Sequence, residues 1–124
     1  MATKISKDEL RKEWLVALRS GDYPQTKQAL RIPGKGYCCL GVLCEILCEK
    51  GVVQRGEDDY LFDTEDEPGI LHMATALETP ILRMVGLTSD DETCLMKMND
   101  GDEDGDGAKE FIEIADYLET ELFA

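Results

Sequence analysis

The segment from Tyr37 to Cys48 constrains the fold more than any other part of the chain, because it is apolar on nearly every face. Its sequence, YCCLGVLCEILC, contains a single charged residue, Glu45. A helix with so small a polar face is stable only when other elements surround it. The sequence therefore predicts a central helix over residues 38–49 that ends at Gly51.

Other helices are predicted from capping signals and apolar spacing. Ser6 and Glu9 have the spacing of a capping box, and apolar residues follow at helical intervals, which predicts a helix over residues 7–19. Ser89 and Glu92 have the same spacing and predict the start of another short helix. The last segment has an apolar stripe with acidic residues on its other faces, which predicts an amphipathic final helix. The stripe consists of Phe111, Ile114, Ala115, Leu118 and Leu122.

One small β-hairpin is also predicted. Two β-prone runs, residues 52–55 and 60–63, flank a polar turn of four residues, so a hairpin is expected over 52–63. Thr79-Pro80 predicts the start of a further short helix. A length of 124 residues fits one domain. We therefore predict a single compact domain over residues 1–124, mainly α (α+β), with about five helices packed round the central helix.

Charge is divided unevenly along the chain. Residues 1–55 contain ten Lys and Arg against six Asp and Glu, whereas residues 56–124 contain three against twenty-one. The first part therefore has a net charge of +4 and the second a net charge of −18, which together give the −14 of the whole chain. Such a field repels phosphate backbones and attracts basic partners or cations. We expect no direct nucleic-acid binding, and a function in binding rather than in catalysis.

The cysteines and the single histidine do not indicate an active site. Four of the five cysteines lie within eleven residues of an apolar stretch, which favours reduced, buried thiols in a cytosol. His72 has apolar neighbours, and a lone histidine of this kind is more often a packing residue than a base. No window approaches the ~18 apolar residues of a membrane span. We predict a cytoplasmic protein that is not an enzyme, has no cofactor and does not bind membranes.

Several motifs together resemble a known family. They are WxxALRSGxYxQ at residues 14–25, YCCLGVLC at residues 37–44, MND at residues 98–100 and IADYLE at residues 114–119. In these motifs the chain resembles a family of small proteins that tailed bacteriophages and prophages encode. The resemblance spans almost the whole chain and implies a phage origin and expression in a bacterial cytoplasm. It implies no activity.

The charge division and the phage setting lead to a primary hypothesis. We expect a non-enzymatic accessory protein that binds and inhibits a host protein, a defence or nucleic-acid-handling factor, by offering an acidic carboxy-terminal face to a basic surface. The carboxylates expected on this face are Asp102, Asp104, Glu110, Glu113, Asp116 and Glu119.

Two alternatives remain open. The first is a sponge that sequesters a small nucleotide signal of the host immune system near the basic amino-terminal side, at an anion site formed by Arg19, Lys27, Arg31, Lys35 and Tyr37. The second is an acidic loop that binds a divalent cation. Asp100, Asp102 and Asp104 match positions 1, 3 and 5 of a calcium loop, but Phe111 stands where the bidentate glutamate belongs, so only weak calcium binding is expected.

Overall fold

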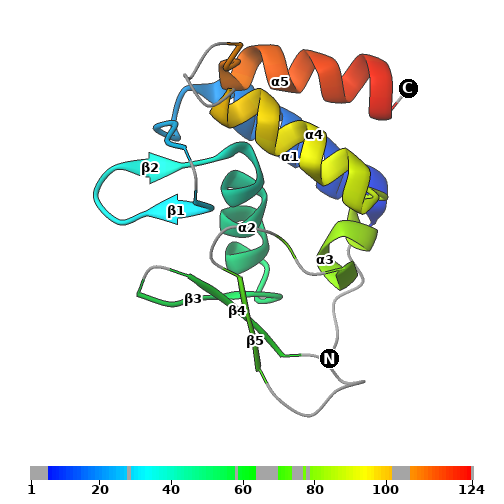
Figure 1. Cartoon of the computed structure of the whole chain (residues 1–124). Coiled ribbons are helices and arrows are strands. Elements are labelled where there is room, and N and C mark those ends of the chain that lie inside the picture. Colours follow the sequence, from blue (N-terminus) through cyan, green and yellow to red (C-terminus); the bar gives the residue numbers. More distant parts are fainter. Residues whose placement is uncertain are drawn as a thin grey trace.

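The computed structural model describes residues 6–27, 29–57, 59–63, 70–73, 77, 79–101 and 107–123. Within these residues the chain is mostly helical, and the predicted mainly α (α+β) fold is confirmed (Figure 1). The helices are α1 (Lys7–Ser20), α2 (Cys39–Glu49), α3 (Thr79–Met84), α4 (Ser89–Asp100) and α5 (Phe111–Tyr117), which continues into a π-helical turn, η1 (Leu118–Leu122). The strands are β1 (Arg31–Ile32), β2 (Gly36–Tyr37), β3 (Gln54–Arg55), β4 (Tyr60–Asp63) and β5 (Ile70–Met73).

Helix α2 lies at the centre, as its sequence predicts. Every residue from Cys39 to Leu47 is buried, and the helix contacts α1, α4, β2 and β3. In Figure 1 the helices α1 and α4 lie on one side of α2, while the strands lie on others. Gly41 allows the backbone of Leu30 to pass directly over α2, because a Cβ atom at residue 41 would overlap the Leu30 carbonyl oxygen. The backbone at Leu30, just before β1, can therefore pack against α2 because residue 41 has no side chain.

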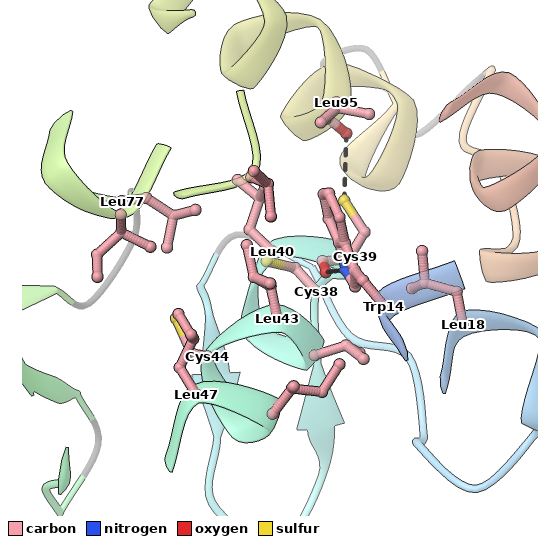
Figure 2. Packing of buried hydrophobic residues seen from close by; sticks show 14 of the residues in the cluster. Trp14, Leu18, Cys38, Cys39, Leu40, Leu43, Cys44, Leu47, Leu77 and Leu95 are labelled. Carbon is pink, nitrogen blue, oxygen red and sulfur yellow. Dashed lines mark hydrogen bonds between the residues drawn. The ribbon is translucent and has the colours of Figure 1, made fainter. Parts of the chain in front are cut away.

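Helix α1 packs against both α2 and α5. The indole of Trp14 is completely buried, and its Nε1–H donates a hydrogen bond of 2.9 Å to the carbonyl oxygen of Cys39 (Figure 2). This carbonyl lies in the first turn of α2. Leu18, one turn further along α1, is buried in the same core cluster. The apolar stripe predicted on α1 therefore points at the core.

The strands form two small antiparallel sheets. Strands β1 and β2 make a two-stranded hairpin, and the second sheet has the order β3-β4-β5. The predicted hairpin over residues 52–63 is confirmed as β3 and β4, but the prediction of a single hairpin was wrong. Strand β5 extends it, with pairs from Tyr60↔Met73 to Asp63↔Ile70. A run of only four residues, such as 70–73, does not by itself distinguish a strand from a helix. The pairing with β4 makes this run a strand.

The helix caps agree with the sequence at α1 and differ by one residue at α4. The Ser6 hydroxyl accepts a hydrogen bond of 3.4 Å from the Glu9 amide. At α4 the capping box is formed by Thr88 and Asp91, so the prediction of Ser89 and Glu92 was wrong. Glu92 does not close a capping box with Ser89, because its buried carboxylate accepts a hydrogen bond of 2.6 Å from the Leu77 amide. None of the helices in the described ranges is both long and apolar enough to cross a membrane.

Candidate functional site

The last helix displays a row of carboxylates that we name the α5 face. Burial of Phe111, Ile114, Ala115 and Leu118 turns the other positions of α5 and η1 outward. The exposed acidic residues of the α5 face are Glu110, Glu113, Asp116, Glu119 and Glu121. Four of them were predicted as partner-binding residues. The other two predicted residues, Asp102 and Asp104, lie outside the described residues.

Within the described part of the chain, two cations contact the α5 face. Arg19 Nη2, at the end of α1, lies 2.8 Å from Asp116 Oδ1 and 3.2 Å from Glu119 Oε1. Lys109 Nζ lies 3.8 Å from Glu113 Oε2. These pairs are largely exposed to solvent, so each contributes less than about 1 kcal/mol to stability. Hydrogen bonds to Glu119 and then Asp116 raise the pKa of Arg19. The face is partly neutralised, but its five carboxylates still outnumber two cations.

The residues predicted as an anion site are divided among different roles. Arg19 is engaged by carboxylates. Arg31 Nη2 donates to the carbonyl oxygens of Gly56, at 2.6 Å, and Glu57, at 3.2 Å, so Arg31 braces the β3-β4 turn. Arg31, Lys35 and Tyr37 line one pocket of about 220 Å³, which neither Arg19 nor Lys27 lines. Ligand pockets usually exceed about 300 Å³, so this pocket is small for a nucleotide.

Part of the predicted calcium loop is described. Asp100 is the last residue of α4, and its Oδ1 accepts a hydrogen bond of 2.9 Å from Asn99 Nδ2. Asp102 and Asp104 fall in a range that the structure does not describe, so calcium binding stays a prediction. In the part of the chain that is described, no three His, Cys, Asp or Glu residues are grouped closely enough to hold a metal ion.

The thiols of α2 are placed for packing. Cys38 caps α2, with its Sγ accepting a hydrogen bond of 3.4 Å from the Gly41 amide, and Cys39 and Cys44 are completely buried. Burial raises the pKa of Cys38 from 9.0 to about 11 and raises the pKa of Cys39 and of Cys44 well above 9.0. Because the thiolate is the reactive form, thiols that stay protonated at neutral pH are poor nucleophiles and metal ligands.

A pair of amide side chains that sequence reasoning missed, buried Asn99 and half-buried Gln25, joins four parts of the chain. Asn99 Oδ1 accepts hydrogen bonds from the Cys39 amide, at 3.2 Å, and from Gln25 Nε2, at 2.9 Å. Asn99 Nδ2 donates to the carbonyl oxygen of Thr26 at 2.8 Å, and Gln25 Oε1 accepts from the Phe111 amide at 3.2 Å. Gln25 and Asn99 occur in two of the motifs that carry the family resemblance. The structure gives both a role in holding α2, α4 and α5 together.

A buried carboxylate lies on the other side of α2. The Glu45 carboxylate is only 5% exposed and accepts a hydrogen bond of 2.7 Å from the Tyr60 hydroxyl and one of 3.0 Å from Arg55 Nε. Burial and then the hydrogen bond to Glu45 raise the pKa of Tyr60. The buried charged residue of α2 is therefore satisfied by the β3-β4 hairpin.

A wide groove lies between α1 and α2. It has a volume of about 570 Å³, and its lining includes Val16, Ala17, Tyr23 and Ile46. Val16 is 68% exposed although it is apolar. Sequence reasoning missed this site, but a signal was present, because Val16 falls outside the predicted apolar stripe of α1, which consists of Leu10, Trp14, Ala17 and Leu18.

Comparison with known proteins identifies a family whose function is unknown. A family model described as a domain of unknown function, DUF8296, matches residues 6–122. No curated protein and no solved structure matches the chain significantly.

Proposed function

We propose that this chain, which belongs to the DUF8296 family of domains of unknown function, is a non-enzymatic protein that binds a basic surface of another protein through the α5 face. The observation that carries the proposal is the excess of carboxylates on this face. Glu110, Glu113, Asp116, Glu119 and Glu121 are exposed, and among the residues that the structure describes only Arg19 and Lys109 are paired with any of them.

The pairing with Arg19 shapes how such a partner would bind. Asp116 and Glu119 come from successive turns and already hold one guanidinium between them. A partner arginine would either displace Arg19 from these two carboxylates or bind the acidic residues next to them while Arg19 stays in place. Breaking an exposed ion pair costs little free energy, so Arg19 weakens the attraction between the α5 face and a basic partner without abolishing it.

The expected partner is a protein that handles nucleic acid or takes part in host defence. Basic grooves that bind phosphate backbones attract carboxylates by the same long-range field, and occupation of the groove by this chain would inhibit the partner. The resemblance to phage and prophage proteins supports a partner in the cytoplasm of a bacterial host. The proposal includes no chemical step, since the buried thiols of α2 are held in the protonated form.

Affinity capture with matched charge variants tests the proposal. The first variant, Glu110→Gln with Glu113→Gln and Asp116→Asn, removes three charges from the α5 face. The control, Glu9→Gln with Glu57→Gln and Asp90→Asn, removes three exposed charges from other elements and gives the same net charge. We expect a basic host protein to be retained by the wild type and by the control, to be lost with the α5 variant, and to elute as salt rises.

Two results would contradict the proposal. Equal loss of the captured protein with both variants would mean that net charge alone, not the α5 face, attracts it. Retention by the α5 variant that matches the wild type would mean that the partner binds elsewhere.

A further inference from the structure

The groove between α1 and α2 exists because the two helices cross. Lys50 Nζ, just beyond the end of α2, lies 2.8 Å from Glu13 Oε2. The next residue of α1, Trp14, bonds to Cys39 at the beginning of α2. Adjacent residues of α1 thus reach opposite ends of α2, so the helices cross here and diverge beyond. The groove of about 570 Å³ fills the space between the second half of α1 and the last turn of α2.

The floor of the groove is apolar and partly open to solvent. Val16 is 68% exposed, Ile46 is 5% exposed, and Ala17 and Tyr23 are partly buried. The ring of Tyr23 is supported from behind by Tyr37, with ring centroids 5.6 Å apart in an edge-on arrangement. A rigid aromatic wall beside an exposed branched side chain is the kind of surface on which a partner's apolar side chain gains the most from burial.

The rim of the groove is negative on balance. Glu13, Asp22 and Glu49 stand against Lys12 and Lys50, and Lys50 is already paired with Glu13. Glu49 is also the last residue of α2, where the helix dipole is itself negative. The Tyr23 hydroxyl senses this field, since its pKa is raised by burial and then by the charges of Glu49 and Glu45. An anionic ligand would be repelled here, and a cationic one attracted.

Tyr23 connects the groove with a pocket beside the α5 face. Tyr23 lines both the groove and a neighbouring pocket of about 210 Å³, and that pocket is also lined by Glu110, Phe111 and Ile112. Ile112 is 55% exposed on α5. Val16 and Ile112, the large apolar residues that stand out as exposed in the described part of the chain, therefore line two neighbouring hollows that share Tyr23.

We infer that the α1-α2 groove receives an apolar side chain from a segment of the basic partner, with Lys or Arg residues on either side of it that contact the rim and the α5 face. This inference rests on the proposed function and names the part of the partner that gives specificity. Charge alone attracts many basic proteins, whereas a buried anchor in a preformed groove selects among them.

Amide chemical shifts of the full chain, measured during titration with three synthetic peptides, test the inference. The first is a helical peptide of Leu and Lys, the second has Ser in place of each Leu, and the third has Glu in place of each Lys. We expect the Leu/Lys peptide to shift Val16, Tyr23 and Glu49 together with residues of α5. The Ser/Lys peptide is expected to shift α5 alone, and the Leu/Glu peptide to shift neither region.

The peptides separate the two proposals. If the Leu/Lys and Ser/Lys peptides both shift α5 alone, the groove inference is overturned while the α5 face stands. If the Ser/Lys peptide leaves α5 unshifted, the proposed function is overturned. Groove shifts that are as large with the Leu/Glu peptide would overturn the cationic character of the ligand.

A matched pair of variants gives a second readout. Val16→Lys places a cation on the groove floor, and Ile112→Lys makes the same change on α5 at a residue of similar exposure. Both positions face solvent, so both variants should fold. We expect Val16→Lys to weaken binding of the Leu/Lys peptide about tenfold or more, and to weaken it several times more than Ile112→Lys does. Equal losses, or a greater loss with Ile112→Lys, would place the anchor outside the groove.

Discussion

Gly41 is the residue at which one added methyl group would disturb the core most directly. A Cβ atom there would overlap the backbone carbonyl of Leu30, which has no flexible side chain to move away. We predict that Gly41→Ala lowers the free energy of unfolding by about 3 kcal/mol or more, measured by urea unfolding.

Gly51→Ala is the control for this substitution. Gly51 has a φ of 78° and open space around its Cβ position, so it tests backbone conformation without a clash. We expect it to cost roughly 1–2 kcal/mol. Equal costs at the two positions would show that the approach of Leu30 to α2 is not what requires glycine at position 41.

Asn99 and Gln25 are predicted to act as a unit. Asn99→Ala would leave the Cys39 amide and the Thr26 carbonyl without their side-chain partner inside the protein, so we expect a loss of about 3 kcal/mol. In a double-mutant cycle with Gln25→Ala, the direct bond between the two amides should appear as a coupling free energy of about 1 kcal/mol. If the losses in the free energy of unfolding simply add, the two side chains do not stabilise the protein by bonding to each other.

At the scale of the element, α2 makes stability sensitive to alkaline pH. In the unfolded chain its thiols ionise near 9.0, while in the folded protein burial raises the pKa of Cys38 to about 11 and raises the pKa of Cys39 and Cys44 well above 9.0. The folded state therefore binds protons more tightly. Its stability should be fully present below about pH 9 and fall as the pH rises above it, by up to about 1.4 kcal/mol per pH unit for each thiol.

The measurement is the free energy of unfolding between pH 8 and pH 11, in the wild type and in Cys44→Ala. Tyr60 adds to the slope above pH 10, because its pKa is raised from 10.0. We expect Cys44→Ala to be less stable at neutral pH and to have a shallower alkaline slope. An unchanged slope would mean that this thiol ionises as readily in the folded protein as in the unfolded chain.

The elements that could be predicted from the sequence are those whose signals are local. The apolar segment 37–48 predicts α2 closely, and the Ser6 cap predicts the start of α1. Strand β5 was missed because its structure depends on a partner strand, and the cap of α4 was misplaced because the Glu92 carboxylate accepts a hydrogen bond from the Leu77 amide, which lies 15 positions away.

The site was less predictable, for the same reason. The exposure of Glu113 and Asp116 follows from the apolar stripe of the last helix. In contrast, the pairing of Arg19 with Asp116 joins residues 97 positions apart, and nothing local in the sequence indicates it. The α1-α2 groove depends on how two helices cross, which the sequence does not indicate. The one signal in the sequence was Val16, an apolar residue outside the predicted stripe of α1.

At the scale of the whole molecule, the net charge of −14 acts against the compact state. Salt screens this repulsion, although it also weakens the exposed pairs of Arg19 and Lys109. Because the repulsive interactions are far more numerous, we predict that the melting temperature of the free protein rises as salt is increased from low to moderate concentration. Thermal unfolding followed by circular dichroism measures this, and a falling melting temperature would mean that the internal ion pairs dominate.

The most direct test of the account uses Arg19 itself. Arg19→Gln removes the cation that Asp116 and Glu119 hold and makes the net charge more negative by one, and Lys97→Gln makes the same change in net charge at an exposed position on α4. The measurement is the dissociation constant of the Ser/Lys peptide for each variant at low salt. The account predicts tighter binding by Arg19→Gln than by both the wild type and Lys97→Gln. Equal affinities of the two variants, or weaker binding by Arg19→Gln, would contradict it.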